Sequence, residues 1–145
     1  MGMLDVNTKL SAAQAVTSTG DTASTNIYDS GGAASSDIGL QQETWLNVVC
    51  STTATSGGAA TVQAVLQDSA DASSWADALV GAAFPVASVV AGAVLLQTVP
   101  PVGLRRYTRV VYRVGTAALT AGKFEAFYSL DVQRNVSRPS GFTVA

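Results

Sequence analysis

Residues 104–114 read LRRYTRVVYRV, residues 115–122 read GTAALTAG, and residues 123–133 read KFEAFYSLDVQ. Two runs rich in aromatic and β-branched residues flank a connector bounded by glycines, which predicts two antiparallel strands joined as a hairpin. Polar and apolar residues alternate along both runs, so each strand buries one face and turns the other to water or to a partner. No residue in this stretch is of a type and setting typical of a catalyst.

The alternation assigns the side chains of these two strands to opposite faces. In the first run, one face is predicted to hold Thr108, Val110, Tyr112 and Val114, and the other Tyr107, Arg109, Val111 and Arg113. In the second run, one face is predicted to hold Phe124, Ala126, Tyr128, Leu130 and Val132, and the other Glu125, Phe127, Ser129, Asp131 and Gln133.

The rest of the chain predicts further short strands separated by turns rich in Gly, Ser and Thr. Thr44–Thr52 is predicted to be a strand that a hairpin at Ser56–Ala60 joins to a second strand, Thr61–Asp68, in which Val62, Ala64 and Leu66 share a face. Ser24–Asp29 is also predicted to be a strand, whereas Ser11–Thr17 fits either a short strand or a helical turn. A turn is expected at Ser18–Asp21 and loops at Ser30–Ser36 and Asp68–Asp77.

The segment Leu79–Val99 is the one stretch whose hydropathy resembles that of a membrane helix. No charged residue occurs between Asp77 and Arg105, a length that spans a bilayer when it is helical. Proline, glycine and many alanines interrupt the run, however, and these residues disfavour a membrane helix. We therefore expect two extended pieces, around Ala83–Val86 and Val94–Val99, and no membrane partner.

About eight short strands at close spacing, with no convincing long helix, predict an all-β fold. The spacing fits a β-sandwich, a jelly roll or a small barrel, and the expected architecture is a jelly roll or β-sandwich of about eight antiparallel strands. By length the chain is a single domain, 1–145, with extended N-terminal (1–10) and C-terminal (134–145) segments. Phe142 and Val144 are expected to anchor the C-terminus.

Charged residues make up only 12% of the chain, against roughly 25% in a typical soluble domain. This composition suits a protein that packs against others, because the cores of interfaces are depleted in charge. The charges are also unevenly distributed: residues 1–80 hold eight Asp and Glu and one Lys, whereas residues 81–145 hold seven Lys and Arg and two Asp and Glu. The asymmetry fits pairing within one molecule, and it equally fits acidic and basic patches through which subunits meet.

The sequence contains no histidine and a single cysteine, Cys50. Ser-His-Asp and Cys-His catalysis are therefore excluded, together with the commonest transition-metal ligand. An intrachain disulfide is excluded as well, and Cys50 is predicted to be a small buried apolar residue. We expect no enzymatic activity, no cofactor and no metal site.

Four arginines, Arg105, Arg106, Arg109 and Arg113, are interleaved with Tyr107 and Tyr112. This pattern is found on nucleic-acid-binding surfaces, but such domains are usually basic overall, and this chain has a net charge of −2. The favoured interpretation is that the arginines pair with carboxylates such as Glu125 or Asp131 on neighbouring strands or subunits. No nucleic acid is expected as a partner.

An ordered set of short motifs spans nearly the whole chain. The motifs are Ser11–Thr17, Ser24–Asp29, Asp37–Gly39, Ser56–Val62, Phe84–Ala87 with Val90–Gly92, Leu104–Tyr107, Val114–Phe124, Leu130–Gln133 and Ser140–Val144. In this order they resemble the small jelly-roll capsid cement (decoration) proteins of tailed bacteriophages, of the type described for a short-tailed Bordetella phage. The region between Asp68 and Ala82 matches least.

The resemblance implies a structural virion protein that binds the outer surface of an icosahedral capsid and stabilises contacts between capsomers. It implies that the partners are the major capsid protein and the chain itself, more as a homodimer than as a trimer. It also implies a location on the outer capsid surface of the virion, after assembly in the host cytoplasm. The residues expected at the capsid or subunit interface are Arg105, Arg106, Arg109, Arg113, Phe142 and Val144.

The alternative is a carbohydrate-binding β-sandwich or another virion surface module, such as a fibre or tail component. Sugar sites use exposed aromatic rings, and the chain has two tryptophans. Trp45 is predicted to lie mid-strand in the core, whereas Trp75 is predicted to lie in a loop and is the better sugar-binding candidate.

Overall fold

The computed structural model describes residues 6–31 and 44–130, which form one two-layered β-sandwich. Nine strands and two short 3₁₀ helices make up this part of the chain. The strands are β1 (Lys9–Ala15), β2 (Gly20–Ala23), β3 (Tyr28–Asp29), β4 (Trp45–Ser56), β5 (Thr61–Ser69), β6 (Ala76–Pro85), β7 (Val94–Thr98), β8 (Tyr107–Gly115) and β9 (Leu119–Ser129). The 3₁₀ helices are η1 (Val6–Thr8) and η2 (Val86–Ser88).

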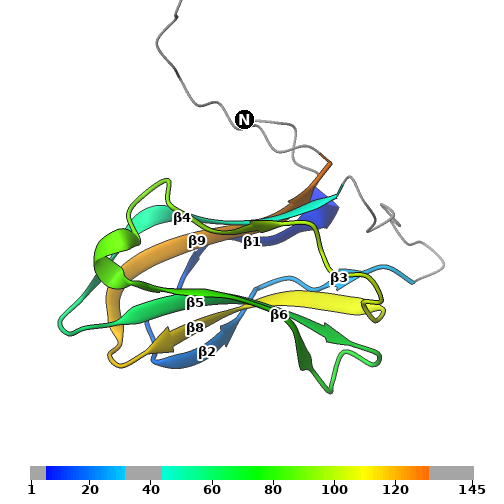
Figure 1. The fold of residues 1–145 in the computed structure, drawn as a ribbon, viewed down its shortest axis with the longest axis horizontal. Helices are drawn as coiled ribbons and strands as arrows, with labels where there is room; N and C mark the ends of the chain where they lie inside the picture. Colours follow the sequence, from blue (N-terminus) through cyan, green and yellow to red (C-terminus); the bar gives the residue numbers. More distant parts are fainter. Residues whose placement is uncertain (1–5, 32–43, 131–145) are drawn as a thin grey trace, which may run out of the picture.

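The strand order is that of a jelly roll. One sheet has the order β1-β9-β4-β7 and the other β2-β8-β5-β6, with the short β3 also paired to β8, and all pairs are antiparallel. The eight main strands therefore pair first with last, second with seventh, third with sixth and fourth with fifth, as in one long hairpin rolled into two layers. Figure 1 shows the two sheets stacked face to face. The prediction of an all-β jelly-roll sandwich is confirmed.

The core lies between the sheets and is filled by the apolar faces that the alternation predicted. Val110, Tyr112 and Val114 of β8 are buried against Phe124 and Tyr128 of β9 and the neighbouring strands. The predicted inward residues of β5, Val62, Ala64 and Leu66, are fully buried too, and so is Cys50. Burial raises the pKa of the Cys50 thiol, which keeps it protonated and unreactive. The prediction for Leu130 is wrong, because this residue follows the end of β9 and is exposed.

The expected hairpins are wrong, although the strands themselves are confirmed. β8 lies in one sheet between β2 and β5, whereas β9 lies in the other between β1 and β4, so residues 116–118 cross from sheet to sheet. The turn at Ser56–Ala60 likewise leads from β4 into β5 across the sandwich. Two strands that each have one apolar face fit a hairpin and a sandwich corner equally well, and the pairing with distant strands decides between them.

The strand expected at Ser24–Asp29 is also largely wrong, because the segment leaves the sheet after Ala23. β2 precedes it, and only Tyr28 and Asp29 form a short strand, β3. The hydroxyl of Ser24 donates to the carbonyl of Asn26, and the Asn26 N–H donates to the Leu10 carbonyl in the opposite sheet, at 2.9 Å each. Local side-chain hydrogen bonds of this kind compete with ladder pairing and direct the chain across the side of the sandwich.

The ambiguous segment and the membrane-like segment both contain strands. Ser11–Thr17 falls mainly in β1. Leu79–Val99 contains most of β6, then η2, then β7. The extended piece expected around Val94–Val99 is confirmed as β7, whereas the bounds expected for the other piece are wrong, because Ala83–Val86 is only the end of β6 and the first residue of η2. Among the helices in residues 6–31 and 44–130, none is long and apolar enough to cross a membrane.

Candidate interaction surfaces

The arginines of β8 lie on the outer face of the second sheet, as the alternation predicted. Arg109 and Arg113 alternate with inward Val110, Tyr112 and Val114, so their guanidinium groups extend over the outside of the sheet. Their neighbours on that face come from β2, β5 and β6, since Asp21 pairs with Arg113 and Gln67 with Arg109 in the sheet register.

Arg113 joins the two sides of this face. Its Nε and Nη2 atoms donate to the two carboxylate oxygens of Asp21 at 2.8 and 3.0 Å, a bidentate pair. Nη2 also lies 3.3 Å from Oδ2 of Asp77 on β6. Arg113 lowers the pKa of the Asp21 carboxyl, chiefly through its hydrogen bonds. One arginine therefore ties β2, β8 and β6 together across the sheet.

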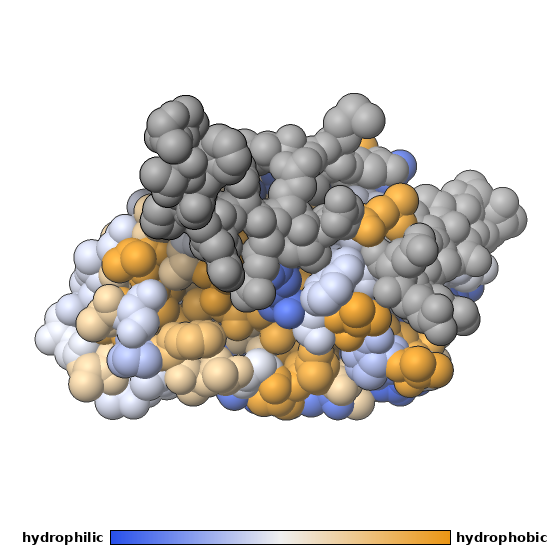
Figure 2. Space-filling view, turned by 45° about the horizontal axis from the view of Figure 1, so that its top comes forward, coloured by the Kyte–Doolittle hydropathy of each residue, from blue (hydrophilic) through white to orange (hydrophobic). Residues whose placement is uncertain are grey.

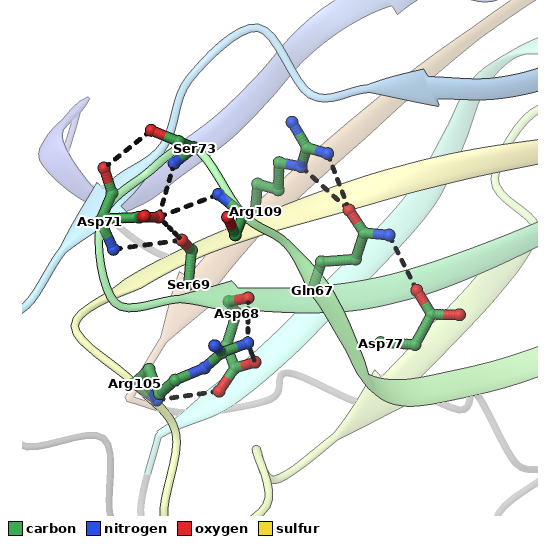
Figure 3. Close-up of polar contacts among 9 residues, drawn as sticks. Gln67, Asp68, Ser69, Asp71, Ser73, Asp77, Arg105 and Arg109 are labelled. Carbon is green, nitrogen blue, oxygen red and sulfur yellow. Dashed lines mark hydrogen bonds and ion pairs between the residues drawn. The ribbon is translucent and has the colours of Figure 1, made fainter.

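Arg109 is held by a neutral side chain and an aromatic ring. Both its Nε and its Nη2 donate to Oε1 of Gln67, at 3.0 and 2.9 Å, and the Gln67 amide donates in turn to Oδ1 of Asp77 at 2.8 Å. The guanidinium lies 4.2 Å from the centre of the Trp75 ring, within the range of a cation–π interaction. Figure 3 shows the chain of contacts from Arg109 through Gln67 to Asp77.

Arg105 and Arg106 fasten the segment that leads into β8. The Arg105 side chain and backbone N–H both bind the Asp68 carboxylate at the end of β5. Arg106 makes a bidentate pair with Asp29, at 2.8 and 2.9 Å, and stacks over Tyr107. The Arg106 guanidinium, with help from the Gly31 N–H, holds the pKa of the Asp29 carboxyl near 2.

The acidic first part and the basic second part of the sequence thus form ion pairs with each other within one molecule. In the described residues every ion pair joins an aspartate from residues 1–80 to an arginine from residues 105–113. Within one chain the expected pairing of the arginines with Glu125 is wrong, because Glu125 lies on β9 in the other sheet. The second expected partner, Asp131, lies outside the described residues, as do Phe142 and Val144. The arginine face is consequently close to neutral and internally bonded.

A second surface lies on the side of the sandwich where each sheet ends, at β6 and at β7. These two strands contact each other across the gap between the sheets. Val80, Val90 and Val94 along this side are 51, 48 and 47% exposed, and no charged residue occurs from Ala78 to Leu104. In Figure 2 much of the lower half of the view, toward β6 and β7, is orange or tan. We call this surface the open side.

The opposite side of the sandwich is closed by hydrogen bonds between the layers. Asn26 donates from its backbone to the Leu10 carbonyl and from its side chain to the Lys9 carbonyl, at 2.9 and 3.0 Å. Gln14 of β1 donates to the Ala23 carbonyl at 2.8 Å and accepts from the Thr25 N–H at 2.9 Å. The edge of β1 is therefore occupied by the chain itself.

Sequence reasoning missed the open side and the aspartate partners of the arginines. The run without charge between Asp77 and Arg105 was the one sequence feature that pointed to the open side, but such a run fits buried strands as well as an exposed edge. The prediction that Trp45 belongs to the core is wrong. Trp45 is half-buried, because Leu46 and Val48 take the inward positions of β4.

No cluster of three or more His, Cys, Asp and Glu side chains that could hold a metal ion occurs within residues 6–31 and 44–130. Asp71, the exposed carboxylate of the β5–β6 loop, accepts from the N–H groups of Ser74 and Ser73 and from the Ser69 hydroxyl. These bonds hold its pKa near 2 and serve to shape the loop (Figure 3).

The fold and its surfaces define a jelly-roll sandwich whose charges are paired internally and whose open side is uncharged. In a comparison with known families, the sequence profile of the Bbp16 family matches residues 10–128. The chain belongs to the Bbp16 family, a family of Bordetella phage proteins. No curated protein sequence matches the chain.

Proposed function

We propose that the chain is a capsid cement protein, which binds the outer surface of an icosahedral phage capsid and stabilises the contacts between capsomers. The observation that carries the proposal is the membership in a phage protein family over residues 10–128, a range that includes nearly all of both sheets. Its partners would be the major capsid protein and other copies of itself, on the outer surface of virions assembled in the host cytoplasm.

The surface chemistry supports a role in assembly. Neutral surfaces lose little hydration free energy when they are buried, and cores of protein interfaces are depleted in charge. Here the arginine face carries its own counter-charges, and the open side has no charge from Ala78 to Leu104. On a symmetric shell many copies bind together, so a modest affinity at each site accumulates into substantial reinforcement.

On this proposal the chain contributes binding energy and no chemistry. It needs no cofactor, no nucleic acid and no membrane, and it is not an enzyme. The alternative of carbohydrate binding through Trp75 is less well supported, because the Arg109 guanidinium already occupies one face of that ring at 4.2 Å. A glycan array with a Trp75→Ala control separates the two functions.

Co-sedimentation tests the proposal. Shells assembled from the major capsid protein alone are mixed with the purified chain and pelleted, and the bound chain is counted per capsid protein. We expect binding that saturates at a fixed ratio and resists moderate salt, since the surfaces involved are neutral. Failure to co-sediment at any ratio contradicts the proposal.

A further inference from the structure

Arg109 differs from the three other arginines in and just before β8. Arg105, Arg106 and Arg113 each pair with an aspartate of the same chain, at 2.8 Å in every case. Among the residues that the structure describes, no carboxylate pairs with Arg109, which is bound instead by the neutral oxygen Oε1 of Gln67. Of the four arginines expected at an interface, three therefore already have a counter-charge within the chain, and Arg109 does not.

One edge of the Arg109 guanidinium is left without acceptors. A guanidinium has five N–H donors, and Gln67 accepts one from Nε and one from Nη2. No described residue accepts from Nη1 or from the second N–H of Nη2. In Figure 3 one terminal nitrogen of Arg109 lies on the side away from Gln67. The Nη1 and Nη2 donors together form a planar fork of the kind that binds a carboxylate through two parallel hydrogen bonds.

The Arg109 guanidinium is held in one orientation and is partly removed from water. The centre of the Trp75 ring lies 4.2 Å from it, and Gln67 fixes one of its edges, so its direction is set before a partner arrives. Burial lowers the pKa of Arg109, whereas the pKa values of the other three arginines are raised, chiefly by hydrogen bonds to their aspartates. A cation that is partly desolvated without a counter-ion costs free energy, and a carboxylate supplied by a partner offsets that cost.

The aliphatic part of Arg109 does not explain its charge. Val65 and Val111 are paired on the same outer face and are nevertheless buried, so long side chains of that face must cover them. An unbranched apolar side chain at position 109 would give the same cover. The guanidinium is therefore the part of the residue that packing leaves unexplained.

The chemistry of the partner follows from the charges around Arg109. A nucleic acid is bound by several cations along its backbone, but the neighbouring Arg105 and Arg113 are bound to aspartates. A second copy of the chain is a poor source of carboxylates, because in the described residues its aspartates all accept hydrogen bonds from their own chain and only Glu125 does not. One unpaired fork fits a single carboxylate on a different protein.

We propose that Arg109 binds an aspartate or glutamate side chain of the major capsid protein through the free Nη1–Nη2 edge of its guanidinium, with Trp75 stacked against the guanidinium. The proposal deepens the proposed function and rests on it, since the shell supplies the carboxylate. Arginine and tryptophan are among the residues that contribute most to binding energy at protein interfaces. Because neutral surface encloses this one ion pair, salt screens it little.

Co-sedimentation with shells of the major capsid protein tests the contact. Arg109→Met keeps an unbranched side chain over the sheet and removes the charge and the donors. Lys123→Met is the matched control, because it removes one positive charge from an exposed residue of the other sheet. We expect Arg109→Met to bind at least about tenfold more weakly than the wild type and Lys123→Met to change the affinity by less than about twofold. Equal binding by Arg109→Met and the wild type, or an equal loss in both variants, overturns the proposal.

Carbodiimide coupling gives a second readout that does not depend on Arg109→Met being stable. Arg109→Lys keeps a cation at this position, and the reagent joins its amino group to a contacting carboxylate by an amide bond, while the carbodiimide takes up the elements of water and becomes a urea. Mass spectrometry of the particles identifies the residues joined. We expect a cross-link from position 109 to an Asp or Glu of the capsid protein that wild-type particles lack. A cross-link from position 109 to another copy of the chain, such as to its Glu125, or no cross-link, overturns the proposal.

The failure of this contact and the failure of the capsid function give different results. A wild-type chain that does not co-sediment with shells removes the capsid function and the contact with it. A wild-type chain that co-sediments no better than Arg109→Met leaves the capsid function standing and removes only the contact at Arg109.

Discussion

Asp68 and Arg105 join the end of β5 to the segment before β8 through three hydrogen bonds. The Arg105 side-chain Nη2 donates to Oδ1 of Asp68 at 2.8 Å and to its carbonyl oxygen at 2.9 Å, and the Arg105 backbone N–H donates to Oδ2 at 2.9 Å. The Asp68 side chain is only 13% exposed, whereas that of Asp29 in the comparable pair with Arg106 is 38% exposed. The arginine lowers the pKa of the Asp68 carboxyl, chiefly through its side-chain hydrogen bond.

Asp68→Asn is expected to lower the free energy of unfolding by about 1–3 kcal/mol, because a largely buried charged hydrogen bond is lost. Asp29→Asn is the matched control and is expected to cost clearly less, since water screens its pair. Urea denaturation followed by tryptophan fluorescence measures both changes. Equal losses would show that burial does not distinguish the two pairs.

Gly81 is expected to tolerate no side chain. A Cβ atom at this position would lie 2.7 Å from the Ala64 carbonyl oxygen, a backbone atom that cannot move aside cheaply. Gly81→Ala should therefore cost about 1–3 kcal/mol of stability, the usual range for overpacking. At Gly57 nothing lies within 4 Å of the added Cβ, and Gly57→Ala should change stability by no more than about 0.5 kcal/mol. Thermal unfolding of the two variants compares them, and a neutral Gly81→Ala contradicts the packing described here.

The phenol groups of two core tyrosines differ in their hydrogen bonding. The Tyr128 hydroxyl is 2.9 Å from the Thr108 hydroxyl, whereas the buried Tyr112 hydroxyl has no hydrogen-bond partner among the residues that the structure describes. Tyr128→Phe should cost about 1 kcal/mol, and Tyr112→Phe should cost nothing or stabilise the fold. Chemical denaturation of both variants tests the difference. A larger loss from Tyr112→Phe would mean that its hydroxyl is satisfied.

Stability is expected to fall in acid because Asp29 and Asp71 have pKa values near 2 in the folded chain. A carboxyl whose pKa is lower in the folded state stabilises the fold above its unfolded pKa of 3.8, and that contribution disappears as the pH falls from about 4 through 2. Urea midpoints measured between pH 6 and pH 2 should therefore decline below about pH 4. The double variant Asp29→Asn with Asp71→Asn should decline less steeply over the same range; an identical decline would place the titrating groups elsewhere.

The alternation of residues predicted the core-facing side chains of β5 and β8, but it missed that Val65 and Val111, which are paired on the outer face, are buried as well. It did not predict the sheet to which each strand belongs. Short connectors such as residues 116–118 fit a hairpin as well as a sandwich corner, and the pairing of β9 with β1 and β4 is a property of the whole fold.

The two-residue period of a strand also made part of the candidate site predictable. The outward direction of Arg109 and Arg113 follows from the period of the strand, but their partners Gln67 and Asp21 come from strands brought together only by the jelly-roll order. The sequence did not predict the open side, because an edge strand and a central strand can have the same composition. The sequence shows only that the residues around Val80 are uncharged. The strand order shows that β6 lies at the edge of its sheet, where Val80 is 51% exposed.

The central claim is that the chain reinforces a phage capsid, and a heat challenge of particles tests it most directly. Shells assembled with and without the chain are heated, and the temperature at which they release packaged DNA or lose their light-scattering signal is recorded. The account predicts a clearly higher release temperature for particles that carry the chain, restored when purified protein is added back. Equal release temperatures, with the chain shown to be bound, would contradict it.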